Sequence, residues 1–283
     1  MMRLPESCVA NILSFTTPPD IFSSSSVSSV FRVAADSDFV WEKFLPSDYT
    51  RLISRSTHRS FSSKKELYRR LCESILIDNG RKIFKIEKLT GNISYVLSAR
   101  DLFITWSDQR HYWCWSHRSD SRFSEAVQLI MTNWLEVKGK IQTGVLSPNT
   151  SYGAYLIMKV TKRAYGLDLV PAETWIKVGN GEKKTKTSYL SCLGYKKQQM
   201  EEGLFHAQRM AKKDEIIGSH REEPEMRDDG WMEIEIGGFE TGREGDKEEV
   251  VMSVTEVEGY QLKGGIVIDG IEVRPKPQKK IRC

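Results

Sequence analysis

The sequence lacks the long apolar run that a membrane-spanning helix requires. None of its apolar stretches approaches the roughly 20 residues that cross a bilayer. The N-terminal segment MMRLPESCVANILSF is interrupted by Pro5, Glu6 and Asn11, which argues against a signal peptide. These absences predict a protein of the cytoplasm and nucleus that has no membrane partner.

Cysteine is scarce and shows no pairing pattern. The chain has five cysteines, an odd number, and no CxxC pair among Cys8, Cys72, Cys114, Cys192 and Cys283. In a reducing compartment they are expected to be free thiols. His111, Cys114 and His117 invite a metal interpretation, but alternate residues of an extended segment point to opposite faces and no fourth ligand follows. We therefore expect neither a metal nor another cofactor.

An excess of charge of one sign is also missing. The net charge is only +4, and the basic residues form scattered doublets. Nucleic-acid binding asks for a concentrated basic face interleaved with stacking aromatic residues. The composition therefore predicts no nucleic-acid partner.

The first 45 residues predict three short helices. Pro5 suits the first turn of a helix, and Val9, Ile12 and Leu13 then share one face. Pro18-Pro19 ends that helix, and two residues are expected to cap the following ones, Asp20 and Ser37. A unit this small rarely supplies more than about 3–5 kcal/mol from its own core, so its apolar faces favour a partner. The alternative is an ordinary helical hairpin packed on the rest of the chain.

A connector and a fourth helix follow. Residues 50–62 are polar and basic, and Ser63 with Glu66 forms a capping box. The apolar stripe of this helix is expected to comprise Leu67, Leu71, Ile75 and Leu76. Asn79-Gly80 is expected to end it.

Beyond residue 80 the apolar period changes from 3.6 to 2. Lys82–Lys88 and Ser94–Ser98 flank a turn as in a hairpin. Further strands are expected at Asp101–Trp106, Trp134–Ile141, Ala154–Thr161, Glu173–Val178, Ser188–Leu193, Trp231–Ile236, Val250–Val257 and Ile266–Arg274. Many short alternating strands indicate an antiparallel sandwich. The charged residues 194–230 are expected to form a surface insertion, partly helical over Gln198–Lys213.

The N-terminal fragments LPESCVANILSFT, VSSVFR and AADSDFVWEKFLPSDY resemble the F-box of plant F-box proteins. The resemblance implies docking to an Skp-type adaptor and, through it, to a cullin within an SCF-type ubiquitin ligase. Carried over by position, the adaptor surface would include Leu4, Pro5, Ile12, Leu13, Val27, Val30 and Trp41.

Six later blocks resemble the phloem protein two family, which includes the Nictaba-like plant lectins. They are SARDLFITW, HYWCW, WLEVKGKI, LSPNTSYGAYLIMKV, RDDGWMEIEIG and GGIVIDGIEVRP, and they span roughly residues 78–275. Membership would imply a jelly-roll-like β-sandwich that binds N-acetylglucosamine oligomers or N-glycan cores.

The resemblance also implies a sugar site. Its tryptophans match Trp106 and Trp113, and its glutamates match Glu249 and Glu256, with Glu248 as an alternative acid. An indole stacks on the apolar face of a pyranose, and a carboxylate accepts hydroxyl protons. The two tryptophans could equally be core residues. The remaining ones, Trp115, Trp134, Trp175 and Trp231, are expected to pack inside the sandwich.

These observations predict an α+β multidomain chain. Its parts are an F-box at 1–49, a linker and helix at 50–77, a lectin-like sandwich at 78–275 and a basic tail at 276–283. The leading hypothesis is a non-catalytic substrate receptor of a ubiquitin ligase that selects a client, with the glycan as one means of doing so. The alternatives are a sandwich that reads protein without binding sugar and, less favoured, a glycan-processing enzyme.

Overall fold

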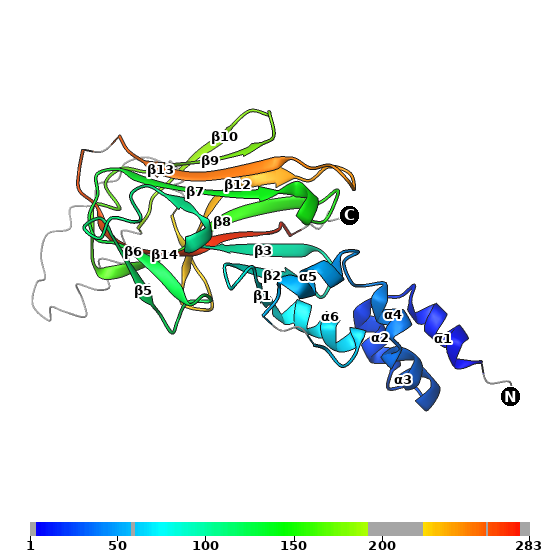
Figure 1. Cartoon of the computed structure of the whole chain (residues 1–283). Coiled ribbons are helices and arrows are strands. Elements are labelled where there is room, and N and C mark those ends of the chain that lie inside the picture. Colours follow the sequence, from blue (N-terminus) through cyan, green and yellow to red (C-terminus); the bar gives the residue numbers. More distant parts are fainter. Residues whose placement is uncertain (1–3, 58–59, 192–222, 259, 278–283) are drawn as a thin grey trace, which may run out of the picture. The chain divides into compact units, whose positions relative to one another are not determined.

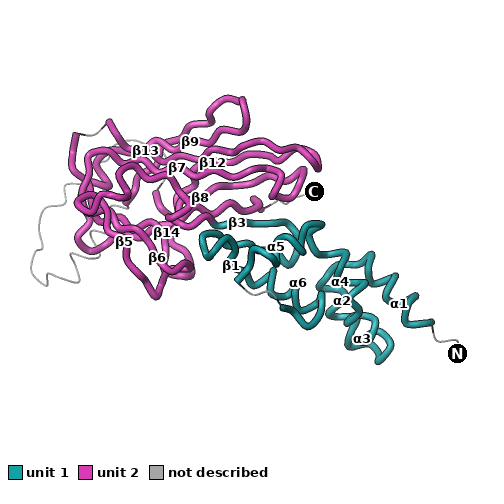
Figure 2. The backbone as a smooth tube through the Cα atoms, viewed as in Figure 1, with its two compact units in different colours: residues 1–96 teal, residues 97–283 magenta. Residues whose placement is uncertain are grey.

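The computed structural model of the chain describes residues 4–57, 60–191, 223–258 and 260–277. The chain divides into two compact units, residues 1–96 and 97–283 (Figure 2). The first unit is mainly helical, and the second is built from antiparallel strands. No helix in the described part of the chain is long and apolar enough to span a bilayer.

Short helices build most of the first unit. They are α1 (Glu6–Leu13), α2 (Pro18–Ser24), α3 (Ser29–Asp36), α4 (Asp38–Glu42), α5 (Tyr49–Arg55) and α6 (Lys64–Glu73). The cap of α2 is Thr17, whose side chain accepts from the Asp20 N–H at 3.4 Å. The expected cap at Asp20 is therefore wrong, because Pro18 and Pro19 already occupy the first helical positions. Ser37 stands at the N-cap position of α4 without making the predicted capping hydrogen bond. Ser63 caps α6 as predicted, accepting from the Glu66 N–H at 3.1 Å.

The end of α6 differs from the prediction. Ser74 has a φ of 105°, a left-handed conformation that ends the helix five residues before Asn79. Ile75 and Leu76 consequently lie in a strand, β1 (Ile75–Ile77), and not on the helical stripe. Asn79 and Gly80 instead form the turn into β2 (Lys82–Ile86), which pairs antiparallel with β1. β3 (Ile93–Ser98) follows the predicted hairpin turn, which the Glu87 N–H closes onto the Asn92 carbonyl at 2.9 Å.

Two sheets face each other in the second unit (Figure 1). Sheet A here denotes the order β14-β8-β12-β11, with β6 beside β14 and β5 beside β6, and sheet B denotes β10-β9-β13-β7-β4. The strands of sheet A are β5 (Trp113–His117), β6 (Glu125–Leu129), β8 (Ser151–Tyr165), β11 (Glu225–Met226), β12 (Met232–Glu240) and β14 (Gly264–Pro275). Those of sheet B are β4 (Phe103–Ile104), β7 (Leu135–Gln142), β9 (Ala172–Val178), β10 (Lys184–Ser188) and β13 (Glu249–Glu256).

The core of this unit lies between the two sheets. On β13 the buried set Val250, Met252 and Val254 alternates with residues of the outer face. Gly139 of sheet B packs against Ile271 of sheet A so closely that an added Cβ would come within 2.9 Å of the isoleucine Cδ1. The predicted antiparallel sandwich after a helical N-terminal region is thereby confirmed.

Some strands were missed or misplaced. The expected strand at Ser188–Leu193 is shifted, because β10 runs over Lys184–Ser188. β5 and β6 were not predicted, since HYWCW and its partner lack a clean alternation. Most of the expected insertion at 194–230, including the helix over Gln198–Lys213, lies outside the described residues.

Candidate adaptor and sugar surfaces

The helical unit carries several of the residues expected at an adaptor surface on its exterior. Leu4 is 59% exposed and Ile12 is 53% exposed, and Pro5 and Val27 are exposed too. Val30 is half-buried on α3. Leu4 and Pro5 immediately precede α1, and Ile12 lies in its last turn. These side chains are therefore available to a partner.

Two of the expected adaptor residues lie in the interior instead. Leu13 is buried and Trp41 is fully buried, with its indole N–H donated to the Ala35 carbonyl at 2.7 Å. The Trp41 ring lies 5.2 Å from that of Tyr68 on α6 and 5.1 Å from that of Phe22. The expectation that a 45-residue unit leaves Trp41 uncovered is wrong, because α6 completes the aromatic cluster. Trp41 thus stabilises the unit and presents no surface.

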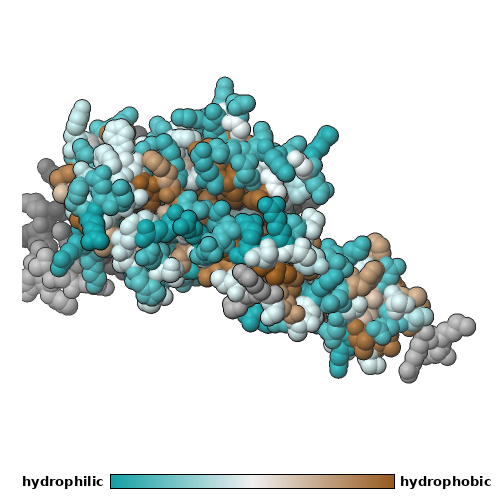
Figure 3. Space-filling view, in the orientation of Figure 1, coloured by the Kyte–Doolittle hydropathy of each residue, from teal (hydrophilic) through white to brown (hydrophobic). Residues whose placement is uncertain are grey.

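Other exposed apolar residues of the helical unit were not predicted. Phe15, Val33 and Phe39 are all exposed, and Figure 3 shows hydrophobic side chains gathered on this unit. A groove of about 700 Å³ is lined by α1 residues, including Ala10 and Asn11, and by Phe39 of α4. Phe15 lies two positions after the end of α1, and Phe39 directly precedes the buried Val40 and Trp41 on α4, so helical periodicity alone does not separate these residues from the core.

Trp106 is the one of the two predicted sugar-binding tryptophans that reaches the surface. It is 38% exposed, and its ring stacks on Tyr112 at 5.0 Å with an interplanar angle of 28°. Its φ is 59°, in the left-handed region that non-glycine residues seldom adopt. Such strain of about 1–3 kcal/mol persists where surrounding structure enforces it, and it clusters at functional sites.

Trp113, the other predicted sugar-binding tryptophan, does not reach the surface. Its side chain is buried, and its indole N–H donates to the Thr105 carbonyl at 3.0 Å. Trp115 is half-buried beneath the Arg100 guanidinium, which lies 3.6 Å from the ring centroid. The assignment of Trp113 to sugar contact is thus not compatible with the structure, because no face of its ring is open.

Glu249 and Glu256 do not share a site either. They are the two ends of β13, so about 23 Å of extended strand separates them. Glu249 is exposed and pairs with Lys140 at 3.0 Å, and Glu248 lies at the same end. Glu256 is buried in an ion pair with Lys263. The two predicted glutamates therefore cannot hold one sugar ring together.

A polar and aromatic cluster that was not predicted lies on the outer face of β4 and β7. Trp134 is 44% exposed, so its assignment to the core is wrong. Phe103 is 61% exposed on β4. Between them the Glu136 carboxylate accepts from the Thr105 hydroxyl at 2.8 Å and pairs with Lys138 at 2.5 Å. The signal was present in the sequence, because Trp134 alternates in phase with Glu136 and Lys138, not with the apolar residues of β7.

Comparison with known proteins decides the family. The family model for phloem protein 2 matches residues 92–275, and the F-box domain model matches residues 1–43. The chain belongs to the phloem protein 2 family. It is 78% identical to the F-box protein PP2-B15 of Arabidopsis thaliana over 98% of both chains. It is 67% identical to the F-box protein PP2-B13 of the same plant, over 99% of this chain and 100% of the relative. It is 66% identical to the F-box protein VBF, also of Arabidopsis thaliana, over 98% of this chain and 100% of the relative.

The two matches confirm the family resemblance that the sequence suggested. An F-box joined to a phloem protein 2 domain supports a substrate-receptor-like role, in which the F-box binds an Skp-type adaptor. The names of the relatives, all F-box proteins, are consistent with a role in substrate recognition.

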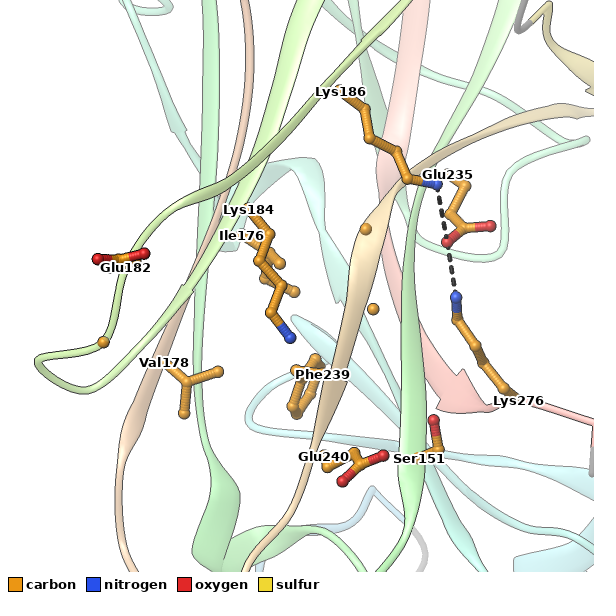
Figure 4. Close-up of a pocket in the computed structure, with 13 residues that line it drawn as sticks. Ser151, Ile176, Val178, Glu182, Lys184, Lys186, Glu235, Phe239, Glu240 and Lys276 are labelled. Carbon is orange, nitrogen blue, oxygen red and sulfur yellow. Dashed lines mark hydrogen bonds and ion pairs between the residues drawn. The ribbon is translucent and has the colours of Figure 1, made fainter.

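A groove of about 560 Å³ opens in the phloem protein 2 domain between β9 and β10 on one side and β12 on the other. Figure 4 shows Lys186 and Lys276 both directed at the Glu235 carboxylate, at 3.6 and 2.7 Å. Ile176 and Phe239 contribute its apolar lining. None of the predicted sugar residues lies there.

Glu233 and Glu235 are the two carboxylates of β12 whose pKa values matter for the alternative of a glycan-processing enzyme. Burial would raise the pKa of Glu233, but hydrogen bonds and charge from Arg274 and Arg227 outweigh it and hold that pKa below its ordinary value. For Glu235, Lys276 and Lys186 likewise outweigh burial and lower the pKa. A glycosidase needs one carboxyl group with a raised pKa as general acid. Neither of these two residues meets that requirement. In the described residues, no group of three or more His, Cys, Asp or Glu side chains is placed to hold a metal ion.

Proposed function

We propose that this chain is the substrate-recognition subunit of an SCF-type ubiquitin ligase in the cytoplasm and nucleus. The F-box binds an Skp-type adaptor and, through it, the cullin. The phloem protein 2 domain binds a client protein. Ubiquitin transfer belongs to other subunits, so this chain makes or breaks no covalent bond.

The observation that carries the proposal is the exposed apolar surface of the helical unit. The unit buries its own aromatic cluster around Trp41, yet Leu4, Ile12 and Phe15 stay exposed around α1. Exposed apolar patches on a soluble unit mark interaction sites. The F-box match over residues 1–43 supports an Skp-type adaptor as the partner for this surface.

The adaptor surface can be tested with the double variant Leu4→Ala, Pro5→Ala. We expect it to lose adaptor capture in a pull-down at least about tenfold, because the residues that anchor the centre of an interface each cost about 2 kcal/mol or more when truncated. The strand signal in circular dichroism should be unchanged. Leu89→Ala is the matched control, since Leu89 is a solvent-exposed leucine in the turn between β2 and β3 of the same unit. Undiminished capture by the double variant would refute the assignment.

We further propose that the phloem protein 2 domain binds N-acetylglucosamine oligomers or N-glycans of its client. Support comes from Trp106, which is exposed, strained and stacked on Tyr112 at one end of the sandwich. An exposed indole face suits the apolar face of a sugar ring. The alternative is that the same domain binds the polypeptide surface of the client and does not bind sugar.

Glycan binding should be weak, with Kd between about 1 μM and 1 mM, because an open surface offers few stacking faces and exposed hydrogen bonds. A glycan array on the full chain, followed by titration calorimetry, measures it. Trp106→Ala should reduce binding at least about tenfold, while Leu169→Ala, at another exposed loop residue, should not. If no N-acetylglucosamine glycan binds at 10 times the upper Kd limit, roughly 10 mM, the protein-reading alternative replaces this proposal.

A further inference from the structure

The strand register places five side chains on one outward face at the edge of sheet B. Phe103 pairs with Lys138, and the Thr105 N–H bonds to the Glu136 carbonyl at 3.1 Å, so these four side chains share a face. The intervening residues Ile104, Leu135 and Val137 are all buried between the sheets. Trp134, two positions before Glu136, lies on the same outward side. We refer to Phe103, Thr105, Trp134, Glu136 and Lys138 as the edge cluster.

The edge cluster differs from an ordinary solvated sheet face. The solvent face of an antiparallel sheet is typically polar, yet this one carries two aromatic side chains that are 61% and 44% exposed, Phe103 and Trp134. Trp106, which is 38% exposed, follows Thr105 in the chain, and its ring stacks on Tyr112. Exposed apolar groups that gather on one face and are rimmed by polar residues are typical of an interaction surface.

Hydrogen bonds and an ion pair within the edge cluster hold the Glu136 carboxylate in place. The Lys138 ammonium holds the pKa of Glu136 below its ordinary value despite partial burial, with further hydrogen bonds from Thr105 and Trp134. Glu136 is therefore ionised near neutral pH, and its side chain is 19% exposed. A carboxylate has about four acceptor positions on its two oxygens. Its local donors hold it in one orientation, and its exposed part can still accept from a ligand.

This combination matches the chemistry of a sugar chain. The apolar faces of pyranose rings stack on exposed indole or phenyl rings, and sugar hydroxyl or amide protons donate to a fixed carboxylate. On the neighbouring strand β13, Thr255 lies opposite Glu136 and is half-buried, whereas Ser253, opposite Lys138, is fully buried and contacts the Thr255 hydroxyl at 3.0 Å. Glu249 and Glu256 cannot supply the carboxylate, because one lies at the far end of β13 and the other is buried.

We infer that the edge cluster is the carbohydrate subsite of this domain, with Glu136 as the acceptor and Trp134 as a stacking platform. The inference rests on the glycan binding proposed above and names the residues that carry it. Trp113, Glu249 and Glu256 have no part in it. The ligand class is an oligosaccharide with N-acetylglucosamine units, and recognition is by stacking and hydrogen bonds without bond cleavage.

The test compares four variants of the full chain for binding of the N-acetylglucosamine trimer by titration calorimetry. Glu136→Gln should weaken binding about tenfold, since a hydrogen bond to a charged acceptor becomes a neutral one. Trp134→Ala should weaken it at least as much, and Trp134→Phe should retain most of it because a ring remains to stack. Glu249→Gln is the matched control, as Glu249 is also a lysine-paired carboxylate of sheet B. It should bind as the unchanged chain does.

The outcomes separate this inference from the proposed function. If the unchanged chain binds the trimer and both Glu136→Gln and Trp134→Ala bind equally well, the subsite is wrong while glycan recognition stands. If the unchanged chain does not bind the trimer or other N-acetylglucosamine glycans, both fail. If client capture depends on Trp134 in a chain that binds no sugar, the edge cluster is a protein-binding surface and the inference is overturned. Unchanged thermal unfolding of Glu136→Gln together with weaker binding excludes a purely structural role.

Discussion

Replacing Trp231 by alanine should destabilise the phloem protein 2 domain by about 3–5 kcal/mol, the usual cost of removing a buried tryptophan. Trp231 is buried against Ala126, Ile157 and Val267, and its indole N–H donates to the Asp120 carbonyl at 2.7 Å. The variant loses the packing of a large ring and leaves that carbonyl without its donor. Chemical denaturation followed by the strand signal in circular dichroism measures the free energy of unfolding.

The matched control is Trp134→Ala in the same domain. Trp134 is exposed on the outer face of sheet B, so its removal should cost less than about 1 kcal/mol. The two variants delete the same type of side chain in different environments, so the difference between their losses of unfolding free energy measures the contribution of burial. Equal destabilisation by both would show that Trp134 is a core residue, which would also remove the stacking platform from the edge cluster.

Breaking the buried pair of Lys263 and Glu256 should have a comparable effect. Both side chains are almost fully buried, and the Lys263 ammonium also donates to the Asn133 carbonyl at 3.0 Å. Burial lowers the pKa of Lys263, which shows the cost of holding this charge inside. Lys263→Met removes the cation and leaves a buried carboxylate, for which we expect a loss of about 3–5 kcal/mol in unfolding free energy.

The double variant Lys263→Met, Glu256→Leu is the control for the loss of charge. Replacing both partners by apolar groups removes the uncompensated charge, so stability should recover to within about 1–2 kcal/mol of the unchanged chain. The pair also ties the segment at 132–134 to that at 263, where Thr132 and Lys263 exchange backbone hydrogen bonds of 3.0 and 2.8 Å. If the single variant loses less than about 1 kcal/mol, the two charges are solvated and the pair does not organise these loops.

Local sequence signals were sufficient for much of the fold. Ser63 and the alternation in β7 and β13 act through the conformations of neighbouring residues, so the start of α6 and these long strands could be predicted. The errors occurred where local signals were weak or were overridden. Ser74 ends α6 through a left-handed backbone conformation that no composition rule assigns to serine.

The functional residues divide in the same way. The sequence by itself determined the two family motifs and, through the family resemblances, named Leu4, Ile12 and Trp106 as candidates, whereas the exposure of Ile12 beside the buried Val9 and Leu13 came from the structure. The sequence also contained the alternation that puts Trp134 on the same strand face as Glu136, although a tryptophan in a sandwich suggested a core position.

Only the tertiary structure decided which of these side chains can meet. Trp41 is covered by Tyr68 from a helix about 27 residues later in the chain, and Glu256 is neutralised by Lys263 across a loop. Glu249 and Glu256 belong to one strand but lie at its opposite ends, whereas Thr105 and Glu136 are 31 residues apart and bond directly. Pairing between strands sets such distances, and one sequence read alone does not reveal it.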